Sequence, residues 1–117
     1  MEILEIRTLR GPNYWSGYWK KLIIMRLDIG GYEDLPSDKL DGFYGRMNEV
    51  MPSLLTHGCS YGEEGGFLRR VQEGTWAGHI IEHFALELQT LAGMDTGYGR
   101  TRETGERGIY NVVFSYH

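Results

Sequence analysis

The chain has 117 residues, of which 41% are hydrophobic, and its formal net charge is −4. This length favours one domain, residues 1–117, with a single core, and the acidic balance gives no general case for nucleic-acid binding. No apolar run approaches the roughly 18 residues that suggest a membrane span, and the first residues lack the basic and apolar regions of a secretory signal. Cys59 is the only cysteine, so no internal disulfide can form, which suits a reducing cytoplasm.

The first third of the chain predicts two strands joined by a loop. Residues 2–7 alternate well enough for a strand, and residues 8–17 contain Gly-Pro-Asn, which is typical of a loop. Tyr14 and Trp15 in this loop are interpreted as packing groups, with the alternative that they form a rim for an extended substrate. Residues 21–29 carry a β-branched pair and end at two glycines, so they are the clearest strand.

The middle of the chain predicts scaffold helices. A helix is expected to begin near Ser37, a possible N-cap, and to end near Met51, because Pro52 follows. Its apolar residues recur at helical spacing, so we expect it to form core rather than a site. Residues 56–66 are polar and rich in glycine, and residues 67–73 are expected to form a short helix.

Residues 78–89 are predicted to form the central helix of the domain. Thr75 is a possible N-cap, and Gly93 is placed to end the helix. An apolar stripe along this helix is expected to dock on a core, because its members fall within about 80° of one another at about 100° per residue. The members of the stripe are Ile80, Phe84, Leu88 and Leu91.

The last part of the chain predicts two more strands, at residues 100–104 and 109–116, separated by the glycine-rich turn 105–108. The order is therefore two strands, two or three helices and two strands. This order predicts an α+β fold, with a mostly antiparallel sheet and two or three helices packed on one face.

The central helix contains the sequence His-Ile-Ile-Glu-His at residues 79–83, the inverted form of a zinc-protease signature. At about 100° per residue, His83 lies about 40° around the helix from His79, so the two imidazoles can hold one ion. Glu82 lies on the same side, where a carboxylate can take a proton from water at the metal. The alternative is that these histidines are ordinary polar residues, because so short a pattern also occurs without metal.

A catalytic zinc site usually has three protein ligands and one water, so the histidine pair leaves one protein ligand to be found. Cys59 is the first candidate, because a thiolate is a good zinc ligand. Its alternative role is a small buried apolar group. His57, Glu87 and Glu103 are further candidates, although a solvated or ion-paired role suits each of them better.

Two pairs of charged residues are candidates for binding charged groups of a substrate. Arg100 and Arg102 alternate on a predicted strand and share a face, which suits bidentate binding of carboxylates. Glu63 and Glu64 are suited to receive cationic side chains. The alternative for each of the four residues is an ordinary charged surface.

Several stretches of the chain, in the right order, resemble the N-terminal domain of cyanophycin synthetase, and together they cover essentially the whole length. They are more specific than the five-residue motif alone. These stretches are residues 8–16 (Thr-Leu-Arg-Gly-Pro-Asn-Tyr-Trp-Ser), 27–28, 42–44, 52–54, 66–68, 78–89, 99–104 (Gly-Arg-Thr-Arg-Glu-Thr) and 110–114 (Tyr-Asn-Val-Val-Phe).

The resemblance implies a domain that holds cyanophycin, a polyaspartate backbone with arginine on each side chain. Its partners would be the polymer and the ATP-grasp and Mur-ligase-like domains of the synthetase. This chain has no Gly-x-x-x-x-Gly-Lys-Ser/Thr stretch, so we expect no ATP site in it. We expect an isolated N-terminal domain, either a piece of a larger synthetase or a small relative.

The resemblance also implies a possible activity, because some members of the family are thought to cut the polymer into primers in this domain. The chain would then be a metal-dependent amidohydrolase of the HxxEH type, with Zn²⁺ on His79, His83 and Cys59 and with Glu82 as general base. Tyr14 and Trp15 could stack on guanidinium groups. The alternative function is a non-catalytic module that anchors the growing polymer for the ligase domains.

Overall fold

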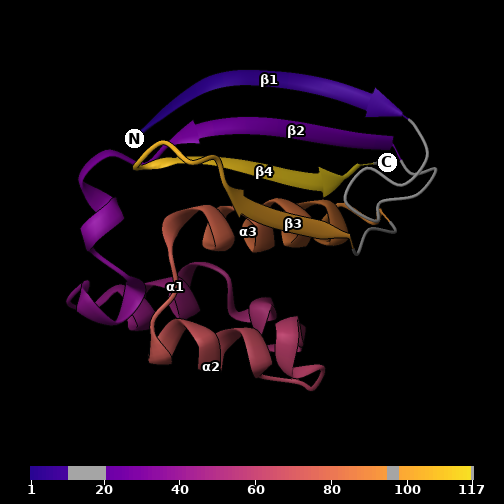
Figure 1. Cartoon of the computed structure of the whole chain (residues 1–117). Coiled ribbons are helices and arrows are strands. Elements are labelled where there is room, and N and C mark those ends of the chain that lie inside the picture. The colour runs from indigo at the N-terminus through magenta and orange to yellow at the C-terminus, as the bar shows by residue number, and fades with distance from the viewer. Residues whose placement is uncertain (11–20, 95–97, 117) are drawn as a thin grey trace.

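The structure of the protein is a computed structural model, and it describes residues 1–10, 21–94 and 98–116. Within these residues, one antiparallel sheet has the strand order β1-β2-β4-β3 (Figure 1). The strands are β1 (Glu2–Arg10), β2 (Lys21–Asp28), β3 (Gly99–Glu103) and β4 (Ile109–Ser115). The α helices are α1 (Phe43–Val50), α2 (Gly66–Glu73) and α3 (Ala77–Leu91), and short 3₁₀ helices span Gly30–Asp34, Ser37–Lys39, Pro52–Thr56 and Cys59–Tyr61.

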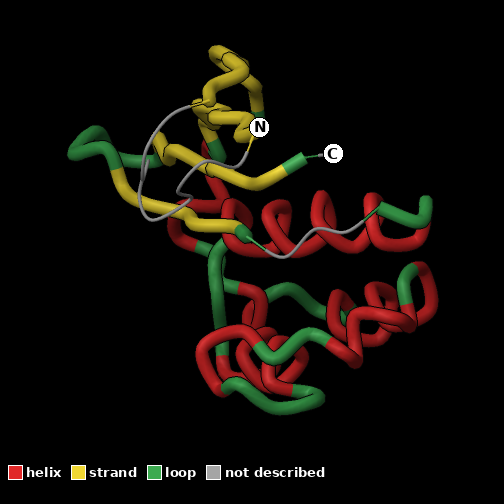
Figure 2. The backbone as a smooth tube through the Cα atoms, turned by 90° about the vertical axis from the view of Figure 1, so that its right-hand side faces the viewer, coloured by secondary structure: helices red, strands yellow, loops and turns green. Residues whose placement is uncertain are grey.

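Helix α3 lies between the sheet and the remaining helices, so the molecule has three layers (Figures 1 and 2). The predicted α+β fold, with helices on one face of an antiparallel sheet, is confirmed. One apolar cluster, which includes Leu27 and Val112, joins the sheet to Ile81 of α3. A second cluster, which includes Phe67, joins α2 to Ile80 on another side of α3. Helix α3 is therefore in contact with apolar residues on two sides.

Helix α3 approaches strand β3 closely. A Cβ atom added at Gly78 would lie 3.0 Å from the Thr101 methyl carbon, so a larger residue at this position would push the helix away from the strand. This approach fixes the distance between α3 and β3, which carry most of the residues discussed below. No helix in the described ranges is both long enough and apolar enough to cross a membrane.

Two predicted boundaries in the first half of the chain are wrong. Strand β1 extends to Arg10, where residues 8–10 were expected to be loop, because it pairs with β2 as far as Lys21. The helix expected from Ser37 begins only at Phe43. The Ser37 hydroxyl instead donates to the Val71 carbonyl at 2.7 Å and accepts from the Thr75 amide at 2.9 Å. It therefore ties a 3₁₀ helix to the last turn of α2 and to the chain before α3, and it is not the N-cap that was predicted.

Two expectations about α3 are also wrong. The N-cap residue is Trp76, because the Thr75 hydroxyl bonds the His79 ring. The predicted apolar stripe is buried only in part, since Leu88 and Leu91 are 58% and 60% exposed. The helix buries residues on two sides, so a single stripe does not describe it. By contrast, Gly93 has φ +86° just past the helix, as a helix-ending glycine should.

The start of α2 is packed directly against the loop that precedes it. A Cβ atom added at Gly66 would lie 2.1 Å from the Gly58 carbonyl oxygen. The Phe67 amide also donates to the His57 carbonyl at 3.0 Å. Because the obstructing atom belongs to the backbone, only glycine fits at position 66 without moving the loop.

We predict that Gly66→Ala lowers the free energy of unfolding by about 1–3 kcal/mol, the usual cost of overpacking. Chemical denaturation followed by circular dichroism measures this change. Gly45→Ala in α1 is the matched control, because nothing lies within 4 Å of an added Cβ there. We expect the control to be neutral or more stable by up to about 1 kcal/mol. Equal effects of the two substitutions would contradict the close contact.

Candidate metal centre

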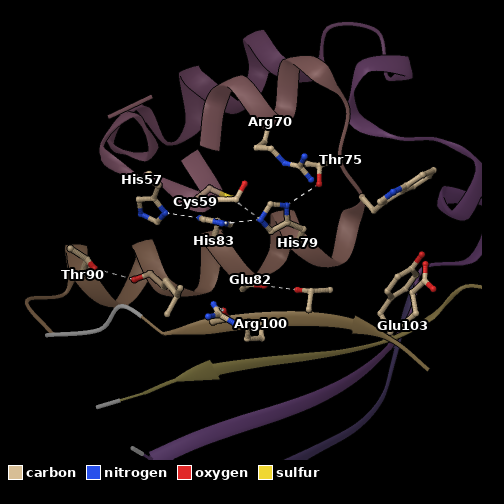
Figure 3. Close-up of a pocket in the computed structure, with 17 residues that line it drawn as sticks. His57, Cys59, Arg70, Thr75, His79, Glu82, His83, Thr90, Arg100 and Glu103 are labelled. Atoms are coloured by element: carbon tan, nitrogen blue, oxygen red, sulfur yellow. Dashed lines mark hydrogen bonds between the residues drawn. The ribbon is translucent and has the colours of Figure 1, made fainter. Parts of the chain in front are cut away.

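A cavity of about 880 Å³ lies between α3, β3 and the loop before α2 (Figure 3). Helix α3 contributes His79, Glu82 and His83 to its lining, and the loop contributes His57 and Cys59. The histidine side chains point toward α2, and the Glu82 side chain points toward β3. The structure thus brings together residues that lie far apart in the sequence.

Three potential ligand atoms converge at one end of this cavity. The His79 Nε2 atom lies 3.2 Å from the Cys59 Sγ atom and 3.1 Å from the His83 Nε2 atom. All three ligand atoms lie within 4.8 Å of one another. Two nitrogens of a tetrahedral zinc site, each about 2.0–2.1 Å from the ion, are separated by about 3.3 Å. The spacing of the ring nitrogens therefore fits a zinc ion.

Burial keeps His79 and His83 neutral, which is the form of histidine that binds a metal. Desolvation, with a smaller contribution from Arg70, lowers the pKa of His79 to about 4. Desolvation also lowers the pKa of His83 to about 3, with smaller contributions from His79 and His57. At neutral pH, protons therefore compete weakly for these nitrogens.

The aromatic ring of Phe67 in α2 packs against the rings of His79 and His83. It stacks on the His83 ring at a centroid distance of 3.9 Å, and it meets the His79 ring edge-on at 5.7 Å. The Thr75 hydroxyl bonds the His79 Nδ1 atom at 2.8 Å. Each ring thus has a contact that directs its Nε2 atom toward the cysteine. Such supporting contacts are typical of metal-binding histidines.

Cys59 reaches this position through an unusual backbone conformation. Its φ is +51°, the only positive φ among the described non-glycine residues. A residue held in such a region costs on the order of 1–3 kcal/mol and persists only where its surroundings impose it, often at a functional site. The Gly58–Gly66 contact is one such constraint. The loop is therefore held with the thiol facing α3.

Glu82 is 6% exposed, and its Oε2 atom accepts a hydrogen bond from the Thr101 hydroxyl at 2.6 Å. Burial raises the pKa of Glu82 to about 7, against smaller lowering effects of the Thr101 hydrogen bond and the Arg100 charge. A Cβ atom added at Gly99 would lie 2.6 Å from the Glu82 Cγ atom, so glycine at that position leaves room for the carboxyl group. A carboxyl group that titrates near neutral pH can both accept and return a proton.

The further candidate ligands have other places in the structure. The ring nitrogens of His57 lie 2.8 Å from His83 Nδ1 and 2.5 Å from the Glu87 carboxylate. His57 and Glu87 therefore contact each other behind His83. Glu103 lines the cavity from β3.

The predicted substrate-binding residues are not all at the cavity. Arg100 lines it and lies over the Tyr98 ring at 5.3 Å. Arg102 is exposed on the same strand and is not among the described lining residues. The same holds for the exposed loop residues Glu63, which pairs with Arg69 at 3.3 Å, and Glu64. Tyr14 and Trp15 lie outside the described residues.

The sequence analysis did not assign several lining residues to the site, among them Arg70, Thr75 and Thr101. The Nε atom of Arg70 is buried and has no hydrogen-bond partner within the described part of the chain. Thr75 stands one helical turn before His79, which is a signal that helical spacing alone could have supplied. Thr101 faces α3 because it alternates with the two arginines of β3.

Comparison with known proteins gives a consistent result. Residues 23–117 match the family described as Cyanophycin synthase-like N-terminal domain. The chain is 61% identical over 116 residues to the cyanophycin synthetase of Crocosphaera subtropica, covering 99% of this chain and 13% of that protein. It is 60% identical over the same length to the cyanophycin synthetases of Synechocystis sp. and Trichormus variabilis.

The chain therefore spans 13% of the length of these curated relatives. The resemblance found in the sequence is confirmed by both comparisons. The chain belongs to the cyanophycin synthase-like N-terminal domain family.

Proposed function

We propose that this domain is a zinc-dependent hydrolase that cleaves cyanophycin chains to make primers, within a polymer-binding domain of cyanophycin synthetase. The observation that carries the proposal is the convergence of Cys59 Sγ, His79 Nε2 and His83 Nε2 on one point. The proposed substrate follows from the relatives, which are named cyanophycin synthetases.

The proposed reaction is the hydrolysis of an amide bond. A zinc ion held by the three ligands would polarise the scissile carbonyl and lower the pKa of a water. Glu82 takes a proton from the attacking water as the new carbon–oxygen bond forms. It then gives this proton to the leaving nitrogen as the carbon–nitrogen bond breaks.

The charges around the cavity suit a polymer of alternating sign. Arg70 and Arg100 line it from α2 and β3, so each can receive a carboxylate of the substrate. Glu103 lines it as well and can receive a guanidinium group.

A second candidate function is a non-catalytic module that anchors the polymer for the ATP-grasp and Mur-ligase-like domains. The observation that favours it is the Thr101 hydrogen bond, which directs the Glu82 carboxyl group toward β3. Arg70, Arg100 and Glu103 would serve this function equally well. Two measurements separate the two functions. The hydrolase must bind zinc and shorten the polymer, whereas the anchoring module needs to do neither.

The first prediction concerns zinc binding. We expect the wild-type protein to bind one zinc ion, and free zinc at about 100 times the Kd to raise the Tm by roughly 10 °C. His79→Ala should abolish both effects, because it removes one ligand. Elemental analysis and thermal unfolding measure them, with Leu88→Ala on the exposed side of α3 as control. Equal zinc content in wild type and His79→Ala would contradict the site.

The second prediction concerns the general base. Glu82→Gln should lower the rate of polymer cleavage by at least about 100-fold, and its zinc content should stay unchanged. Gel analysis of polymer length over time measures the rate. Glu49→Gln, on the exposed side of α1, is the matched control and should keep the wild-type rate. Cleavage by Glu82→Gln at that rate would exclude the mechanism. A zinc-loaded wild type that binds polymer without shortening it would favour anchoring.

The third prediction concerns substrate recognition. Arg100→Ala should weaken polymer binding about tenfold, because a hydrogen bond to a charged group contributes about 1.5 kcal/mol or more. Isothermal titration with soluble polymer measures the Kd. Arg46→Ala is the control, because Arg46 is exposed on α1 and bonds Glu49. If both variants bind as tightly as the wild type, Arg100 does not contact the substrate.

A further inference from the structure

A chain of three side chains runs behind the proposed metal ligands. The Glu87 Oε2 atom lies 2.5 Å from His57 Nε2. His57 Nδ1 lies 2.8 Å from His83 Nδ1 (Figure 3). The other nitrogen of His83 is the one that faces His79 and Cys59. This series of hydrogen-bonded side chains therefore links the Glu87 carboxylate, through the rings of His57 and His83, to the His83 Nε2 atom, which is a proposed metal ligand.

The chemistry of these groups determines which atom donates and which accepts in each of these hydrogen bonds. An ionised carboxylate can only accept a hydrogen bond, so His57 must donate to Glu87 from Nε2. A neutral His57 then has an unprotonated Nδ1 atom, which can only accept. As long as His57 is neutral, His83 must therefore donate from Nδ1, and this leaves a lone pair on its Nε2 atom. A lone pair on Nε2 is what a metal ion requires.

Burial protects this arrangement from water. The side chains of His57 and Glu87 are 15% and 4% exposed. A buried carboxylate without a partner is costly, so Glu87 strongly favours a donor at this position. The His57 ring also lies near Phe67, at a centroid distance of 6.2 Å, which restricts its movement.

We propose that His57 and Glu87 are positioning residues that hold His83 in the Nδ1–H tautomer and thereby prepare its Nε2 atom for a divalent transition metal. This inference rests on the metal site of the proposed function. His57 and Glu87 were candidate metal ligands in the sequence analysis, and this inference gives them the role of supporting His83 instead. Partners of this kind typically change metal affinity by about 10–100-fold.

The second ligand histidine provides an internal comparison. His79 Nδ1 contacts the Thr75 hydroxyl at 2.8 Å, and a hydroxyl can donate as well as accept. Thr75 therefore does not impose a tautomer on its partner, whereas the Glu87–His57 pair does. Thr75→Val should leave the tautomer of His83 unchanged, and this makes it a suitable matched control.

The test begins with the tautomer of His83 in metal-free protein, read from proton–nitrogen correlation NMR of the ring nitrogens. We expect the Nδ1–H form in the wild type and in Thr75→Val. Glu87→Gln should give a mixture, because an amide can either accept or donate. His57→Phe should shift His83 to the Nε2–H form, and His57→Asn should keep the Nδ1–H form through its side-chain oxygen.

Zinc affinity is the second readout, measured by competition with a chelating dye. Glu87→Gln and His57→Phe should bind zinc about 10–100-fold more weakly than the wild type, and His57→Asn should recover part of this loss. Thermal unfolding checks that each variant is folded, and the near-isosteric Glu87→Gln keeps the test valid if His57→Phe does not fold.

Two results would overturn the inference: an Nε2–H tautomer of His83 in the wild type, or wild-type zinc affinity in folded Glu87→Gln. A wild type that binds no zinc would overturn the proposed function instead. In that case the tautomers of the wild type and the variants still decide whether the pair positions His83.

Discussion

The structure depends on the burial of polar side chains along α3, a helix packed between two apolar clusters. Glu82, His83 and Glu87 on this helix are 6%, 7% and 3% exposed. Buried polar groups are costly unless each has a hydrogen-bond partner. Here the partners come from other elements, Thr101 on β3 and His57 in the loop before α2. The need to satisfy these groups therefore ties the sheet, the central helix and the loop together.

Glycine contacts set the distances that make this pairing possible. Gly78 lets α3 approach β3, Gly99 leaves space for the Glu82 side chain, and Gly66 seats α2 against the carbonyl of Gly58. These contacts lie around the cavity, and each of them depends on the absence of a Cβ atom at the glycine. The geometry of the candidate site is thus set by backbone packing as much as by the side chains that line it.

Much of the fold could be predicted from the sequence, because strands and the central helix leave clear periodic patterns. The helix expected from Ser37 was wrong, since its side chain bonds two backbone groups of other segments. Local patterns do not contain such tertiary contacts. The apolar stripe predicted for α3 was also only partly buried. A single stripe describes a helix with one buried side, whereas α3 has two.

The candidate metal ligands could be predicted from the sequence more readily than the residues that position them. Helical geometry places His79 and His83 together, and the chemistry of zinc points to Cys59, which the structure brings beside them. The position of His57 depends on the path of an irregular loop, which no periodicity encodes. Glu87 could therefore be recognised as a nearby carboxylate but not as the partner of His57.

The central claim is that three atoms on α3 and its neighbouring loop bind one metal ion. A crystal of the domain grown with zinc, with diffraction data recorded on both sides of the zinc absorption edge, tests it most directly. The account predicts a single anomalous peak about 2.0–2.3 Å from His79 Nε2, His83 Nε2 and Cys59 Sγ. A zinc-soaked crystal with no peak between these atoms, and with the two rings still hydrogen-bonded to each other, would contradict it.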